Sequence, residues 1–146
     1  MRIHALPEDV LARARGWAGT DEFHELLESP GAPLRCCLRR AGVGEPLVLF
    51  RYAPSAGRGP YEEVGPVFAH MLPCGGLESA DVFPEAFAHN RRLLRTYTAD
   101  GRIHGGEIAE PEELNERIEE LLNNPLVAEV QVRSASHGCY LFHITT

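Results

Sequence analysis

The chain contains no lysine, because all 14 of its basic residues are arginine. This absence excludes a lysine Schiff base and the lysine of a phosphate-binding P-loop. Long hydrophobic runs are also missing, because no apolar run approaches the ~20 residues that a membrane helix needs. The first ten residues lack a basic region followed by an apolar core, so we expect a cytoplasmic protein without a secretory signal.

Positive charge is scarce overall, since 21 acidic residues give the chain a net charge of −7. A nucleic-acid partner is therefore not expected, because such proteins present clustered positive charge to phosphates. Cysteine is limited to four residues, which we expect to be free thiols in a reducing compartment. The length of 146 residues and the hydrophobic fraction of 44% are those of one globular domain with its own core.

The helical patterns predict an N-terminal helical extension over residues 1–31 and one longer helix near the C-terminus. Proline in the first turn and neighbouring acids favour helices that open at Pro7 and at Pro111. A second short N-terminal helix is expected after Thr20, which is a good N-cap residue. Apolar residues at helical spacing extend the late helix to Leu122.

The rest of the chain, residues 32–146, reads as an α+β core built on strands. Alternating apolar runs predict strands at 34–39, 46–52, 67–72, 92–98, 103–109, 126–133 and 139–145. Glycines at 42 and 44 predict a hairpin between the first two strands, and Asp100-Gly101 predicts another. We therefore expect a single domain with a mostly antiparallel, curled sheet of five to seven strands. The long helix packs on this sheet beside a small N-terminal helical unit.

The stretch from 60 to 76 concentrates reactive side chains between turn-forming residues. It holds His70 and Cys74, and two glycines follow Cys74 directly. Free backbone N–H groups in such a turn stabilise a thiolate, which makes Cys74 a candidate nucleophile with His70 or His137 as its base. His137 and Cys139, at the mouth of the final hairpin, complete the candidate catalytic set.

Several predicted strands each offer an arginine beside a tyrosine or a thiol. In a curled sheet these side chains would line a concave surface and clamp a carboxylate or phosphate in bidentate fashion. The candidate substrate-binding residues are Arg95, Arg133, Tyr61, Arg35 and Cys37. The alternative is that each arginine pairs with an acid or extends into solvent.

Adjacent cysteines at 36 and 37 argue against a shared metal if they lie on a strand, since their thiols then point to opposite faces. On this reasoning Cys36 belongs to the core. Zinc would accept two histidines and two thiols from 70, 74, 137 and 139, but the spacing is neither CxxC nor HxxxH. We therefore predict no metal ligands and no cofactor.

Ordered blocks of the sequence resemble a known family. The blocks are 33–39, 60–70 with Cys74, 94–101 and 132–142. Together they resemble a bacterial family of domains of unknown function, the one numbered 1203, from Pro33 to Ile144. The resemblance implies no activity, but it implies that the thiol, His70 and arginine positions belong to one recurrent pattern. The N-terminal helices fall outside it.

Three functions are compatible with these residues. The first is an enzyme that acts on an anionic, carboxylate-type small molecule through a Cys/His pocket with anchoring arginines. The second is a non-catalytic binding or regulatory domain that uses the same pocket, and the third is a Cys/His metal-site protein. The expected partner is an anionic small molecule, with no nucleic acid and no membrane, and a homodimer is left open.

Overall fold

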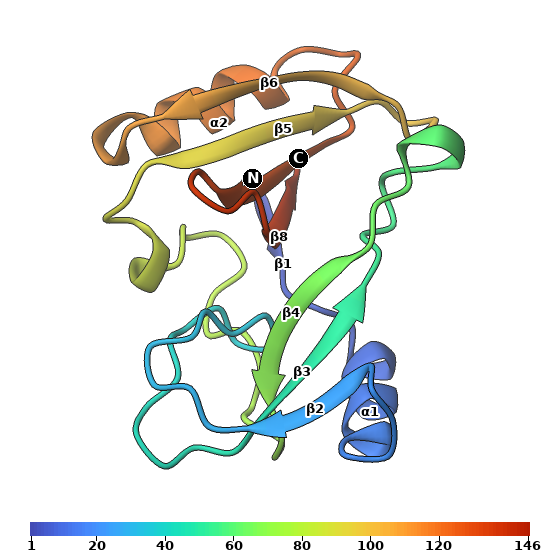
Figure 1. The fold of residues 1–146 in the computed structure, drawn as a ribbon. Coiled ribbons are helices and arrows are strands. Elements are labelled where there is room, and N and C mark those ends of the chain that lie inside the picture. Colours follow the sequence, from blue (N-terminus) through green and yellow to red (C-terminus); the bar gives the residue numbers. More distant parts are fainter.

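A computed structural model describes residues 1–146 and has two antiparallel sheets with two α-helices (Figure 1). The five-stranded sheet has the order β1-β8-β7-β5-β6, and the three-stranded sheet has the order β2-β3-β4. The strands are β1 (Arg2–His4), β2 (His24–Leu27), β3 (Leu47–Tyr52), β4 (Gly65–His70), β5 (Arg92–Tyr97), β6 (Ile103–Ala109), β7 (Glu129–Ser134) and β8 (Tyr140–Thr145). The helices are α1 (Glu8–Trp17) and α2 (Leu114–Leu122), with 3₁₀ turns η1 (Gly59–Tyr61), η2 (Glu85–Phe87) and η3 (Pro111–Glu113).

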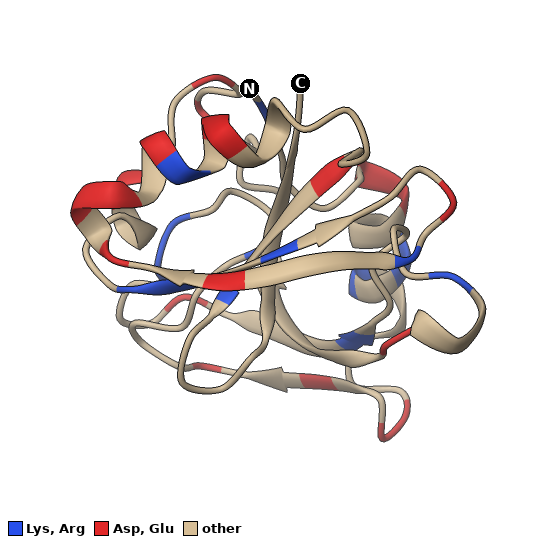
Figure 2. Cartoon of the chain, turned by 90° about the horizontal axis from the view of Figure 1, so that it is seen from above, with Lys and Arg blue, Asp and Glu red and all other residues tan.

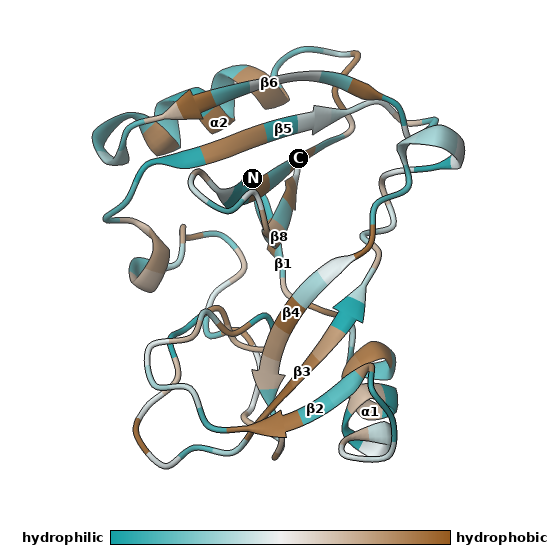
Figure 3. Ribbon diagram, viewed as in Figure 1, coloured by the Kyte–Doolittle hydropathy of each residue, from teal (hydrophilic) through white to brown (hydrophobic).

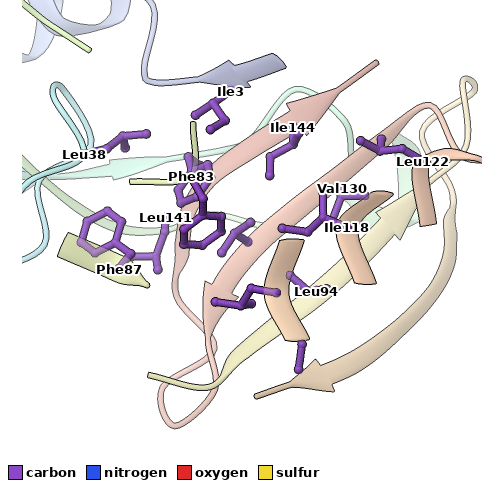
Figure 4. Packing of buried hydrophobic residues seen from close by; sticks show 14 of the residues in the cluster. Ile3, Leu38, Phe83, Phe87, Leu94, Ile118, Leu122, Val130, Leu141 and Ile144 are labelled. Carbon is purple, nitrogen blue, oxygen red and sulfur yellow. The ribbon is translucent and has the colours of Figure 1, made fainter. Parts of the chain in front are cut away.

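The helix α2 covers one face of the five-stranded sheet. It follows η3 directly, and a capping box between Glu110 and Glu113 satisfies backbone N–H groups at this helical start. Its buried positions recur at helical spacing, so brown and teal alternate along α2 in Figure 3. Ile118 lies in a core cluster with Leu94 and Val130 from the sheet (Figure 4).

The three-stranded sheet carries a second core cluster against α1. Leu11 and Ala14 of the helix are buried, and β3 contributes Val48. Tyr140, at the start of β8, also belongs to this second cluster and packs 5.8 Å from the Tyr52 ring. The end of one sheet therefore helps to build the core of the other.

Several predicted elements are confirmed close to their expected bounds. The strand predicted at 103–109 is β6, and it pairs with β5 across the expected turn. Gly101 in this turn has φ 82°, a left-handed conformation that glycine adopts without strain. The helix that opens near Pro7 is α1. Neither α1 nor α2 is long and apolar enough to cross a lipid bilayer.

The predicted arrangement is wrong in three respects. The strands form two sheets rather than one curled sheet, and the predicted long helix spans only 12 residues with its 3₁₀ turn. The predicted second N-terminal helix is the strand β2, and β1 was missed, so the N-terminal unit is not purely helical. Both strands are only three or four residues long. Their conformation is set by pairing with β8 and β3, which lie far away in the sequence.

The predicted strand at 34–39 is a tight turn. The Leu34 N–H donates to the Arg39 carbonyl at 2.9 Å, and the Leu38 N–H donates to the Leu34 carbonyl at 3.1 Å. The predicted hairpin with the next strand is therefore wrong, and β3 lies between β2 and β4. The turn, rather than a strand, decides where the two adjacent cysteines point.

Candidate metal centre

Three thiols and one imidazole converge beside the end of β4. The ligand atoms of Cys36, Cys37, His70 and Cys74 all lie within 4.8 Å of one another. The Cys36 and Cys37 sulfurs are 3.9 Å apart, and they lie 3.6 and 3.8 Å from His70 Nδ1. The first three residues are buried and Cys74 is half-buried. The group is thus compact and largely shielded from solvent.

The turn from 33 to 40 directs both adjacent thiols to the same side. Leu38 has φ 59°, the left-handed conformation that bulky side chains rarely adopt. Its side chain is 1% exposed and enters the hydrophobic cluster of the five-stranded sheet (Figure 4). Burial of this leucine holds the turn in a conformation that costs about 1–3 kcal/mol locally. Backbone strain of this kind is common at functional sites, where the conformation positions side chains at a cost in folding stability.

The last residue of β4, His70, and the turn after it, with Cys74, supply the other two ligand atoms. The His70 backbone is held by a 2.9 Å hydrogen bond from Arg15 Nε to its carbonyl, and its N–H donates to the Cys36 sulfur at 3.3 Å. Gly75 and Gly76 both have positive φ, 83° and 77°, so the chain turns sharply after Cys74. The predicted turn therefore returns the Cys74 thiol to the imidazole four residues earlier.

A carboxylate orients the imidazole from the far side. Glu45 Oε2 lies 2.7 Å from His70 Nε2, and the other carboxylate oxygen accepts a hydrogen bond from the Gly42 N–H. With the proton on Nε2 donated to Glu45, the Nδ1 lone pair faces the three sulfurs. A carboxylate–histidine pair of this kind is the usual outer partner of a metal-bound imidazole.

The two adjacent thiols share a proton unequally. A hydrogen bond from Cys36, with a contribution from the neighbouring Arg39 side chain, lowers the pKa of the Cys37 thiol to about 5. The same hydrogen bond, together with burial, raises the pKa of the Cys36 thiol. One thiolate is thus already favoured in this group at neutral pH, and thiolate is the form that binds metals.

The expectation that the Cys36 and Cys37 thiols point to opposite faces is therefore wrong, because it assumed a strand. The prediction of no metal ligands stays a prediction, although these four residues form a group that could hold a metal ion. His70, Cys74 and Cys37 were selected from the sequence. Cys36 was assigned to the core, which its burial confirms, but its place in this group and the role of Glu45 were missed. The adjacent cysteines were the available signal, and the assumed alternation of faces hid it.

Two predicted catalytic residues, Cys139 and His137, lie outside this group. Both line a separate cavity of about 780 Å³, to which Arg35 also contributes. The predicted common hollow is therefore divided, with His70 and Cys74 in one place and His137 and Cys139 in another. Their roles in catalysis stay predictions.

The other predicted substrate-binding residues lie near Glu63. This carboxylate accepts a hydrogen bond from Arg95 and lies 3.7 Å from Arg133 Nη1. Arg133 is 4% exposed and also donates to the Gln131 side chain at 2.7 and 3.0 Å. The guanidinium carbon of Arg102 lies over the Tyr61 ring, 5.9 Å from the ring centroid. These arginines already have acid or amide partners, and their role in substrate binding stays a prediction.

Fold and site together define an α+β protein with a buried group of three cysteines and one histidine. The chain belongs to the family described as protein of unknown function (DUF1203), whose family model matches residues 31–146. This confirms the resemblance drawn from the sequence blocks. No curated protein and no solved structure matches the chain.

Proposed function

We propose that the protein binds zinc through the sulfurs of Cys36, Cys37 and Cys74 and through Nδ1 of His70. The observation that carries the proposal is the convergence of these four ligand atoms, from separate parts of the chain, within 4.8 Å of one another. Zinc prefers four such thiolate and imidazole ligands in tetrahedral geometry. The residues match that donor set in type and in number.

The distances support the tetrahedral geometry. Bonds of about 2.3 Å to sulfur and 2.0–2.1 Å to nitrogen place tetrahedral ligands about 3.8 Å apart for two sulfurs and about 3.6 Å apart for sulfur and nitrogen. The sulfurs of Cys36 and Cys37 are 3.9 Å apart, and their distances to His70 Nδ1 are 3.6 and 3.8 Å. An ion can therefore enter with movements of a few tenths of an ångström at these three residues.

Four protein ligands favour a structural role over a catalytic one, because catalytic zinc keeps one position for water or substrate. The ion would tie the 33–40 turn to the end of β4 and to the glycine turn beyond it. Its binding would require the shared proton of the adjacent thiols to leave, so zinc affinity should fall in acid.

Thiol catalysis by the same residues is the second candidate, and the lowered pKa of Cys37 favours it. Against it stands the burial of Cys37, which is only 3% exposed and closed to a substrate. A zinc-bound thiolate is also unavailable as a free nucleophile. The two functions therefore exclude each other at this group, and one measurement distinguishes them.

The test is elemental analysis of protein purified without chelators or metal-affinity resin. We expect roughly one equivalent of zinc per chain. Cys74→Ser should lose most of it, whereas Cys139→Ser should retain it, because Cys139 is the one cysteine outside the group. Less than about 0.1 equivalent of zinc, iron or copper, even after incubation with zinc and desalting, would leave thiol catalysis as the better proposal.

A further inference from the structure

The large cavity beside the 33–40 turn is lined by four arginines and by no acidic residue. Its volume of about 780 Å³ lies within the range of small-molecule sites. The guanidiniums come from Arg35, Arg40, Arg91 and Arg92. Such a concentration of positive charge is unexpected in a chain with a net charge of −7, whose acidic residues occupy much of α2 (Figure 2).

Arg92 is buried there without a full set of partners. It is 6% exposed, and its Nε donates to the Phe87 carbonyl at 3.1 Å. Its Nη2 is buried and has no hydrogen-bond partner, the only buried side-chain nitrogen or oxygen in the protein in that state. Burial and the nearby Arg40 both lower the pKa of Arg92, which reflects the lack of a neighbouring carboxylate. Arg92 therefore brings to the cavity wall a buried positive charge that no acid of the chain neutralises.

The neighbouring guanidiniums are positioned by backbone oxygens rather than by acids. Arg35 is 3% exposed and donates to the Tyr140 and Pro33 carbonyls at 2.9 and 2.6 Å. Arg40 donates to the Gly31 carbonyl at 3.1 Å. These bonds fix the orientation of each guanidinium but leave its charge without a counter-ion. Of the four arginines, only Arg91 pairs with an acid, Glu110, at 2.7 Å.

An aromatic ring lies between the positive groups. The guanidinium carbons of Arg40 and Arg92 lie 5.5 and 5.7 Å from the Phe87 ring centroid. The ring face attracts both cations and holds them near each other in spite of their repulsion. Phe68 and Leu141 add apolar surface to the same cavity. The cavity therefore combines uncompensated positive charge with room for a carbon skeleton.

We propose that this cavity binds a small organic anion with at least two negative charges, held through a phosphate or carboxylate group by Arg35, Arg40 and Arg92. Planar guanidiniums bind such oxyanions through paired, charge-assisted hydrogen bonds. The anion supplies the counter-charge that no acid of the chain provides at Arg35, Arg40 and Arg92. This proposal uses none of the four metal ligands.

Isothermal titration calorimetry tests the proposal on the full chain at constant ionic strength. The probes are inorganic pyrophosphate, citrate and, as a singly charged control, acetate. We expect saturable 1:1 binding of at least one multivalent probe, at least about tenfold tighter than acetate. Preference for pyrophosphate or for citrate distinguishes a phosphate ligand from a carboxylate one. Failure of both multivalent probes to bind saturably would overturn the proposal.

Variants assign the binding to the cavity. Arg40→Met changes an exposed side chain and should weaken the better probe at least about tenfold, and Arg92→Met should do the same. Arg13→Met is the matched control, since this exposed arginine lies on α1 and pairs only with Asp9. If Arg92→Met does not fold, Arg40→Met decides. Equal affinity in Arg40→Met and Arg13→Met would overturn the assignment. Each protein is titrated both with and without zinc, and the variants are compared within the same metal state.

Discussion

The 33–40 turn has two sides of opposite character. On one side Cys36 and Cys37 join a group whose polar atoms contact one another, and Glu45 completes it. On the other side Arg35 and Arg40 line a cavity in which positive charge lacks acidic partners. The first side has four atoms of the kind that bind a metal ion. The second side has guanidinium groups without an acidic partner. This difference in completeness is why we propose a structural metal site on one side of the turn and a ligand site on the other.

Loss of the sulfur side should have the largest effect. Cys36→Ser removes a buried ligand, and zinc that binds only the folded state contributes about 4 kcal/mol at a thousandfold excess over its dissociation constant. We expect the melting temperature to fall by roughly 10 °C, while Cys139→Ser changes it little. Thermal unfolding followed by circular dichroism measures both. An unchanged melting temperature after chelation would mean that the ion does not stabilise the fold.

The carboxylate behind the imidazole should matter next. Glu45→Gln removes the charge that holds the proton on His70 Nε2, so we expect zinc affinity to fall about tenfold. Competition with a chromophoric chelator measures the affinity. Glu62→Gln, an exposed glutamate outside the group, is the control. Equal affinities in the two variants would show that Glu45 does not orient the ligand.

The two sides of the turn should be coupled, because the same backbone positions both. Removal of zinc should weaken binding of the better anion roughly fivefold, near the lower end of ordinary coupling between sites. By reciprocity, the anion should raise zinc affinity by the same factor. Calorimetry of the zinc-loaded and metal-free protein measures the effect. Identical anion affinities in the two forms would mean that the sides act independently.

The smallest effect concerns acid stability away from the turn. Burial, with a small contribution from His4, lowers the pKa of His143 to about 4. Glu129 lies 3.9 Å from His143 Nε2, and burial raises the pKa of that carboxyl too. The unfolded state therefore binds the proton more readily. The contribution of His143 to stability is present above pH 6.5 and is lost as the pH falls from about 6.5 towards 4.

When the pH falls from 7 to 5.5, His143 should lower the free energy of unfolding by roughly 0.5–1 kcal/mol, after a discount for its partial exposure. Urea unfolding with a chelator present separates this loss from acid release of zinc. His143→Gln should show a correspondingly weaker pH dependence than the wild type. Parallel pH profiles would assign the acid sensitivity to other groups.

Local patterns predicted the elements whose signals are complete within a few residues. Asp100-Gly101 between two apolar runs predicted the β5–β6 hairpin, and proline with neighbouring acids predicted the start of the late helix. The segment at 24–27 was misassigned because its apolar spacing also fits a helix, and its pairing with β3 overrides that preference. Short elements take their conformation from partners that the local pattern does not contain.

The sequence by itself determined the α+β class, the family, the scarcity of positive charge and the choice of His70 and Cys74 as candidate site residues. The tertiary structure alone decided that Cys36 and Cys37 face the same imidazole, because a buried leucine holds a left-handed turn where the local pattern indicated a strand. The tertiary structure alone also decided which arginines line the same cavity. Whether side chains converge depends on how distant segments of the chain pack together. The spacing of residues along the sequence does not contain that information.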